Sequence, residues 1–145
     1  MRRTIRTLAA TATTALLAAA LATGQATAAA PAAPRPSLLV DCLHHGTVRP
    51  AGYTIACADG GNHLTGLTWP RWGRTVAAGT GVQHANDCIP ACANGHIHTF
   101  PVAVTLSKPK RLPHHPGRTY FSRLRLDYGP QRPTPAGHAT YPLTP

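Results

Sequence analysis

Two cysteines and two histidines in the middle of the chain have the chemistry of a metal site. Cys88, Cys92, His96 and His98 follow the pattern C-x3-C-x3-H-x-H. Thiolate sulfur and imidazole nitrogen are ligands that zinc prefers, so zinc is one interpretation. The competing interpretation is a disulfide, which persists in an exported chain. We expect the disulfide and no metal ligand, because an exported cysteine pair normally oxidises before it can hold zinc.

The cysteine count predicts two disulfides. Cys42, Cys57, Cys88 and Cys92 are even in number and allow three pairings. We favour Cys42 with Cys57, which closes one predicted hairpin, and Cys88 with Cys92, which closes the loop C-I-P-A-C. Loop-closure entropy does not choose between the pairings, because crossed bridges close longer loops.

Residues for catalysis are scarce. The three serines, at positions 37, 107 and 122, include none in a G-x-S-x-G elbow, and the chain has no glutamate. His84 and Asp87 are close in sequence, but Asn86 or Asp87 more commonly caps the turn before Cys88. We therefore expect no catalytic residue and no cofactor, and interpret the protein as a non-enzyme.

Both tryptophans lie in the stretch CADGGNHLTGLTWPRWG at residues 57–73. A strand that begins near His63 is expected to end at Trp69, whose side chain belongs to the core. Trp72 is then placed in the following turn, in an environment different from that of Trp69. It is either a partly exposed contact residue or packs over the sheet edge. Trp72, with the neighbouring Arg71 and Arg74, forms the set of ligand-binding candidates.

The chain is strongly basic. Its 14 lysines and arginines face only four acidic residues, which gives a formal charge of +10. This charge favours attraction to anionic wall polymers, acidic lipid surfaces or extracellular nucleic acid. A charge-driven binder would use Arg71, Arg74, Arg111, Arg118, Arg123 and Arg125 and would lose affinity steeply with salt. Aromatic residues and arginines are not interleaved as in platforms for single-stranded nucleic acid.

Composition divides the chain into four parts. Residues 1–28 have the basic start, uncharged apolar run and small-residue cleavage site of a secretory signal peptide. Residues 29–37 and 129–145 are rich in proline and alanine, and are expected to be a disordered linker and a disordered tail. Residues 38–128 are expected to form one compact β domain. The mature protein would be extracellular and would have no membrane span.

Short apolar runs separated by glycine, proline and Asn-Gly predict strands. In the last run, Tyr120, Leu124 and Leu126 share one face, as in a half-buried strand. The pattern predicts an all-β fold, a small antiparallel β-sandwich or barrel of about six to seven short strands, stapled by disulfides. The expected strands are roughly 38–43, 53–58, 63–69, 75–84, 96–106 and 119–128.

Four stretches carry a resemblance to known sequences. They are VRPAGYTIACADGGNHLTGLTWPRWG, GTGVQHANDCIPACANG, FPVAVTLSKPK and YFSRLRLDY, in about residues 41–128. The chain resembles a group of uncharacterised small secreted actinobacterial proteins with an ACADGN turn, a WxxWG segment and an NDCxPxCAxG loop. The resemblance implies secretion and a compact β scaffold, and it implies no activity, ligand or site residue.

Three functional hypotheses come from different classes. The first is a secreted, non-catalytic β domain that binds a cell-envelope or extracellular ligand, such as cell-wall polysaccharide or another extracellular protein. The second is a charge-driven binder of anionic polymers or nucleic acid. The third is a hydrolase or small inhibitor without a recognisable motif.

Overall fold

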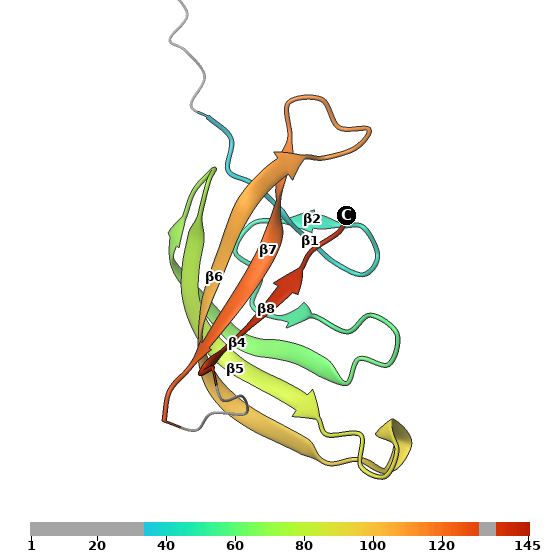
Figure 1. Cartoon of the computed structure of the whole chain (residues 1–145). Helices are drawn as coiled ribbons and strands as arrows, with labels where there is room; N and C mark the ends of the chain where they lie inside the picture. The colour runs from blue at the N-terminus through green and yellow to red at the C-terminus, as the bar shows by residue number, and fades with distance from the viewer. Residues whose placement is uncertain (1–33, 131–135) are drawn as a thin grey trace, which may run out of the picture. The chain divides into compact units, whose positions relative to one another are not determined.

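Eight strands and one short 3-10 helix make up the regular structure in a computed structural model, which describes residues 34–130 and 136–145. Six of the strands form one antiparallel sheet in the order β3-β4-β5-β6-β7-β8, and β1 pairs with β2 (Figure 1). The all-β, antiparallel fold is confirmed: the large sheet curls into a half-barrel. The elements are β1 (Leu39–Val40), β2 (Gly46–Thr47), β3 (Tyr53–Thr54), β4 (Asn62–Trp72), β5 (Ala77–Asn86), η1 (Cys92–Asn94), β6 (Ile97–Arg111), β7 (Thr119–Tyr128) and β8 (His138–Pro142).

The curl of the sheet has a local cause in β4 and β5. Their register shifts twice, between Thr65 and Thr68 and between Thr68 and Arg71, and such bulges increase the twist of a strand pair. Gly79 of β5 passes directly over β4. A Cβ atom at Gly79 would lie 2.3 Å from the carbonyl oxygen of Thr68 and 2.7 Å from the ring of Trp69. Only glycine permits this close approach, so the indole can fold over the neighbouring strand.

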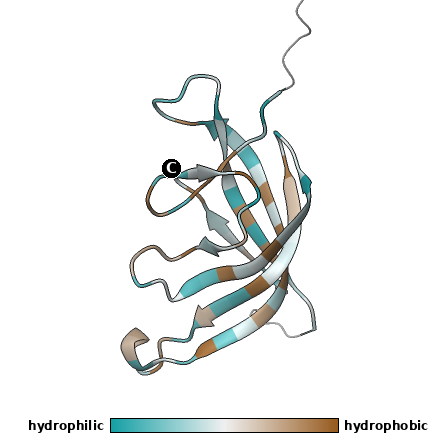
Figure 2. Ribbon diagram, turned by 180° about the vertical axis from the view of Figure 1, so that it is seen from behind, coloured by the Kyte–Doolittle hydropathy of each residue, from teal (hydrophilic) through white to brown (hydrophobic). Residues whose placement is uncertain are grey.

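The core fills the inside of the curled sheet. Along the long strands, apolar bands alternate with hydrophilic ones, as the two faces of a strand require (Figure 2). Phe121, Leu106, Leu124 and Leu126 have no exposed surface. The main cluster consists of Leu39, Leu64, Leu67, Trp69, Ala77, Val102, Val104, Leu106, Phe121, Leu124, Leu126 and Leu143.

Ser37 connects two strands that lie far apart in the sheet. Its N–H donates to the carbonyl oxygen of Gly73 at 3.3 Å, and its hydroxyl donates to that of Arg74, in the turn after β4. The same hydroxyl lies 2.7 Å from Oγ1 of Thr119, at the start of β7. The indole N–H of Trp72 donates to the carbonyl oxygen of Ser37 at 2.9 Å. We call this group of bonds the Ser37 junction. The linker prediction is wrong at Ser37, which is fully buried, while residues 29–33 lie outside the described part.

The C-terminal segment is part of the sheet, which corrects the prediction of a disordered tail for residues 138–143. β8 pairs with β7 from Arg123 to Asp127, and the N–H of Leu143 donates to the carbonyl oxygen of Ser122 at 3.0 Å. Leu143 is 7% exposed and belongs to the core cluster. One anchoring leucine and an edge-strand pairing therefore order a segment whose composition is that of a linker. Residues 131–135 of the predicted tail lie outside the described part.

The two tryptophans share one environment, contrary to expectation. Trp69 is buried in the core as predicted, but β4 continues to Trp72, and the rings meet edge to face at a centroid distance of 4.7 Å. Trp72 also meets the ring of Phe121 edge to face at 5.7 Å. Pro70 lies at the second register shift, where an extra residue interrupts the alternation of the strand. Both indoles consequently face the core although they are three residues apart.

The two disulfides have the favoured pairing. Cys42 is bonded to Cys57 and Cys88 to Cys92, so neither pair offers thiolates for zinc. Disulfides of this kind are typical of chains that fold in an oxidising environment. Within the residues described, there is no helix long and apolar enough to cross a membrane.

Replacing Leu143 tests whether the C-terminal segment supports the fold. We expect Leu143→Ala to lower the free energy of unfolding by about 2 to 4 kcal/mol, because a buried leucine leaves a cavity. Thr144→Ala is the control, since this neighbour is exposed and should change stability by less than about 0.5 kcal/mol. Chemical denaturation of the three proteins measures the difference, and equal stabilities would mean that the segment does not dock.

Removing either indole should be costly. We expect Trp69→Ala and Trp72→Ala each to cost about 3 to 5 kcal/mol of unfolding free energy, because each ring packs in the core and donates a hydrogen bond. Arg71→Ala, the exposed position between them, should be nearly neutral. Thermal melts decide the point, and a Trp72→Ala variant as stable as Arg71→Ala would restore the interpretation of Trp72 as a surface contact residue.

Candidate anion-binding site

The turn between β6 and β7 has a defined backbone. The N–H of Leu112 donates to the carbonyl oxygen of Arg118 at 3.0 Å, that of Arg118 to His115 at 3.1 Å, and that of His115 to Leu112 at 3.3 Å. Gly117 has a φ of +75°, a left-handed conformation that glycine adopts without strain. These bonds fix the backbone of the turn relative to the two strands.

Three arginines from separate segments line a pocket of about 330 Å³ beside this turn. Arg74 comes from the turn after β4, Arg111 from the end of β6, and Arg118 from the residue just before β7. The residues of this arginine pocket are Arg74, Arg111, Leu112, His115, Pro116, Gly117, Arg118 and Thr119.

The Ser37 junction sets the spacing of two pocket walls. Its hydroxyl contacts both the carbonyl oxygen of Arg74 and the hydroxyl of Thr119. Thr119 in turn is the register partner of Arg111 in the β6–β7 pairing. Ser37 thus acts as a positioning residue, which fixes the backbone of the Arg74 turn relative to the strand pair that carries the other arginines.

No carboxylate balances the positive charge in the arginine pocket. Asp41 and Asp87 accept hydrogen bonds from loop backbones, and Asp127 is paired with Arg125 at 2.6 Å. The hydrogen bond from Arg125 also lowers the pKa of Asp127. The chain has four acidic residues, and none of them lines this pocket.

One donor of Arg118, a residue that lines the arginine pocket, has no acceptor. The Nε–H of Arg118 is buried, and within the described part of the chain it has no hydrogen-bond partner. Leaving a buried donor of a charged group unpaired costs more than leaving a neutral one unpaired. This atom has almost no accessible surface, so a ligand in the pocket contacts other atoms of the lining residues.

The arrangement is suited to bind an oxyanion. A guanidinium group presents its N–H donors in a planar fork that matches the oxygens of phosphate and carboxylate groups. His115 adds an imidazole, whose ring N–H is a further hydrogen-bond donor.

A second basic pocket, of about 460 Å³, lies along the same pair of strands. Lys108 and Lys110 belong to β6 and Arg123 to β7. Lys110 and Arg111 are neighbours in β6, and each lines one of the two basic pockets. The residues of this lysine pocket are Lys108, Lys110, Ser122, Arg123, Thr140, Tyr141 and Pro142.

Only one of the three predicted ligand-binding residues lines a basic pocket. Arg74 is in the arginine pocket, whereas Arg71 is exposed on β4 outside it. Trp72 has its ring against Trp69 and its N–H bonded to Ser37, so it is committed to packing. Arg111 and Arg118 are candidates in the sequence by charge alone. No sequence signal singles out His115, and only its neighbourhood in space gives it a role.

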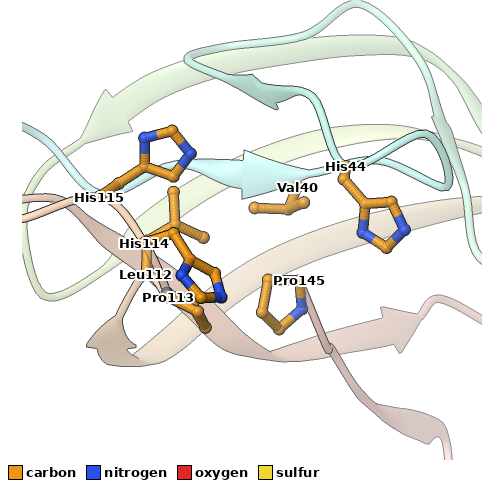
Figure 3. A pocket seen from close by; sticks show the side chains of 7 residues that line it. All are labelled: Val40, His44, Leu112, Pro113, His114, His115 and Pro145. Carbon is orange, nitrogen blue, oxygen red and sulfur yellow. The ribbon is translucent and has the colours of Figure 1, made fainter.

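Three histidines line another pocket, of about 240 Å³, beside the β6–β7 turn. Figure 3 shows His44, His114 and His115 around an apolar group of side chains, with rings that do not converge on one point. The histidine pocket is lined by Val40, His44, Leu112, Pro113, His114, His115 and Pro145. This pocket shares Leu112 and His115 with the arginine pocket.

His96 and His98 converge on an aspartate instead of on the cysteines. Oδ2 of Asp87 lies 3.0 Å from Nε2 of His98 and 3.7 Å from Nδ1 of His96. Oδ1 accepts hydrogen bonds from the backbone N–H groups of His96 and Ile89. Together with the hydrogen bond to the His98 side chain, these bonds hold the pKa of Asp87 far below its usual range. Asp87 therefore organises the loop closed by the Cys88–Cys92 disulfide, as the capping interpretation predicts.

Asp59 lies close to this disulfide, but the group does not form a metal site. Its carboxylate and the sulfur atoms of Cys88 and Cys92 lie within 4.8 Å of one another, which is the only such group of possible ligands within the described residues. Both sulfurs are in the disulfide and cannot supply thiolate ligands.

Replacing Asp87 by asparagine should destabilise the loop in a pH-dependent way. The folded state favours the carboxylate form of Asp87 and lowers its pKa. The stability that this carboxylate contributes is therefore present above the ordinary pKa of 3.8 and is lost as the pH falls below that value. We expect Asp87→Asn to melt at a lower temperature than the wild type near pH 6, and the gap to narrow near pH 2.5. Asp59→Asn is the control, and a gap that does not change with pH would contradict this role of Asp87.

Comparisons with known proteins found no relative of this chain. No protein-family model, no curated protein and no solved structure matches the chain.

Proposed function

We propose that this protein is a secreted, non-catalytic domain that binds a phosphate-bearing polymer of the cell envelope, and that the arginine pocket is its principal contact. The observation that carries the proposal is the convergence of Arg74, Arg111 and Arg118 around a pocket without a carboxylate. Like charges repel, so this grouping is unfavourable in the unbound protein, and an anion offsets the repulsion.

The second basic pocket favours a polymer over a single small ion. The lysine pocket lies on the same two strands as the arginine pocket, and Lys110 and Arg111 are adjacent in the chain. A polymer that passes the end of this strand pair can contact both pockets, and each neutralised phosphate releases counterions.

The composition of the arginine pocket favours a polymer without bases over nucleic acid. Proteins that bind single strands stack the bases on aromatic side chains. No aromatic Phe, Tyr or Trp side chain lines the arginine pocket, and its apolar lining is formed by Leu112 and Pro116. Stacking of uncharged sugar rings on Trp72 is also less well supported, because this side chain packs on Trp69 and Phe121.

Binding to a polyol-phosphate polymer at two salt concentrations tests the proposal. We expect the affinity to fall about tenfold between about 50 and 200 mM salt, as two or three phosphate contacts require. Arg118→Gln should weaken binding and reduce the slope of log affinity against log salt by about 1. Arg71→Gln removes the same charge from a position outside the arginine pocket and should have a smaller effect.

Two results would contradict the proposal. Equal binding of a neutral glucan, without dependence on salt, would favour an uncharged polysaccharide ligand. Tighter binding of single-stranded DNA than of a polyol phosphate with the same number of charges would favour the nucleic-acid alternative.

A further inference from the structure

We propose, on the basis of the function proposed above, that the arginine pocket takes the terminal phosphomonoester of its polymer. The phosphodiester groups along the polymer would then be contacted outside this pocket, by residues such as those of the lysine pocket. The ligand class is therefore a chain end that carries a phosphate dianion.

The number of arginines supports this ligand class. Arg74, Arg111 and Arg118 reach the pocket from three separate segments. A carboxylate or a phosphodiester offers two terminal oxygens, whereas a phosphomonoester offers three, with tetrahedral directions. Three guanidinium groups around one pocket are matched by three oxygens, because each fork bonds to the oxygens that face it.

The size of the pocket favours an end group in particular. Arg118 is partly buried, and the pocket that it lines has a volume of about 330 Å³. A terminal phosphate can enter with one substituent directed to solvent, whereas a diester must accommodate a continuing chain on both sides of the phosphorus.

The pocket is held ready for such a group. Three backbone hydrogen bonds fix the turn from Leu112 to Arg118, and the Ser37 hydroxyl fixes the Arg74 turn against Thr119. The backbone that carries the arginines therefore needs little reorganisation on binding, which favours recognition of a small, compact anion.

Titration of the full-length mature protein with two small probes tests the ligand class. Phenyl phosphate represents the monoester and dimethyl phosphate the diester, at constant ionic strength and near pH 7.5, where the monoester is mainly a dianion. We expect phenyl phosphate to bind about tenfold more tightly or better, since losing one hydrogen bond to a charged group costs at least this factor.

Matched variants separate a built site from general attraction to a basic surface. Arg118→Gln and Arg111→Gln should each remove most of the preference for phenyl phosphate, whereas Arg71→Gln, with the same loss of charge, should keep it. Thermal melts of each variant check that it is folded. Arg111 is exposed at the end of β6, so Arg111→Gln should disturb the fold less than Arg118→Gln.

The outcomes distinguish this inference from the function on which it rests. Three results would overturn the phosphomonoester assignment alone, provided that the polymer still binds. They are equal affinity for the two probes, no detectable binding of either probe, and a preference for phenyl phosphate that survives both pocket variants. Loss of polymer binding together with any of these results would overturn the proposed function as well.

Discussion

The fold depends on the closure of a curled sheet at one buried serine. Ser37 bonds to the turn after β4 and to the start of β7, which lie next to the two edge strands β3 and β8. A curled sheet with open edges exposes both its apolar lining and its unpaired backbone groups. The Ser37 junction covers part of this opening, and it brings Leu39 into the core behind it.

The distribution of charge in the protein follows from the small number of acidic residues. With four aspartates and no glutamate, the chain uses carboxylates mainly as acceptors for loop backbones and for Arg125. The cations at the end of β6 and β7 are left without partners of opposite sign in either basic pocket. The small number of carboxylates therefore accounts for both observations. The aspartates are used within the structure, and no aspartate lines either basic pocket.

The sequence predicts the long strands well, because alternation and turn residues are local signals. The strand from Thr119 to Tyr128 has the predicted bounds. Three features depend on distant partners and leave no such signal: the order of Ser37, the pairing of β8, and the register shift at Pro70 that turns Trp72 inward. The arginine pocket escapes prediction for the same reason, since only the pairing of β6 with β7 and the Ser37 junction bring its three arginines together.

The Ser37 junction joins segments that are far apart in the chain, and this separation affects the order in which contacts form during folding. The bond between Ser37 and Thr119 joins residues 82 positions apart, and that to Trp72 joins residues 35 apart. Contacts between such distant residues close large loops and form slowly. Local hairpins such as β6–β7 can therefore assemble while the Arg74 turn is still free to move. The arginine pocket becomes complete only when the slowest contacts have formed, so a partly folded chain cannot present it.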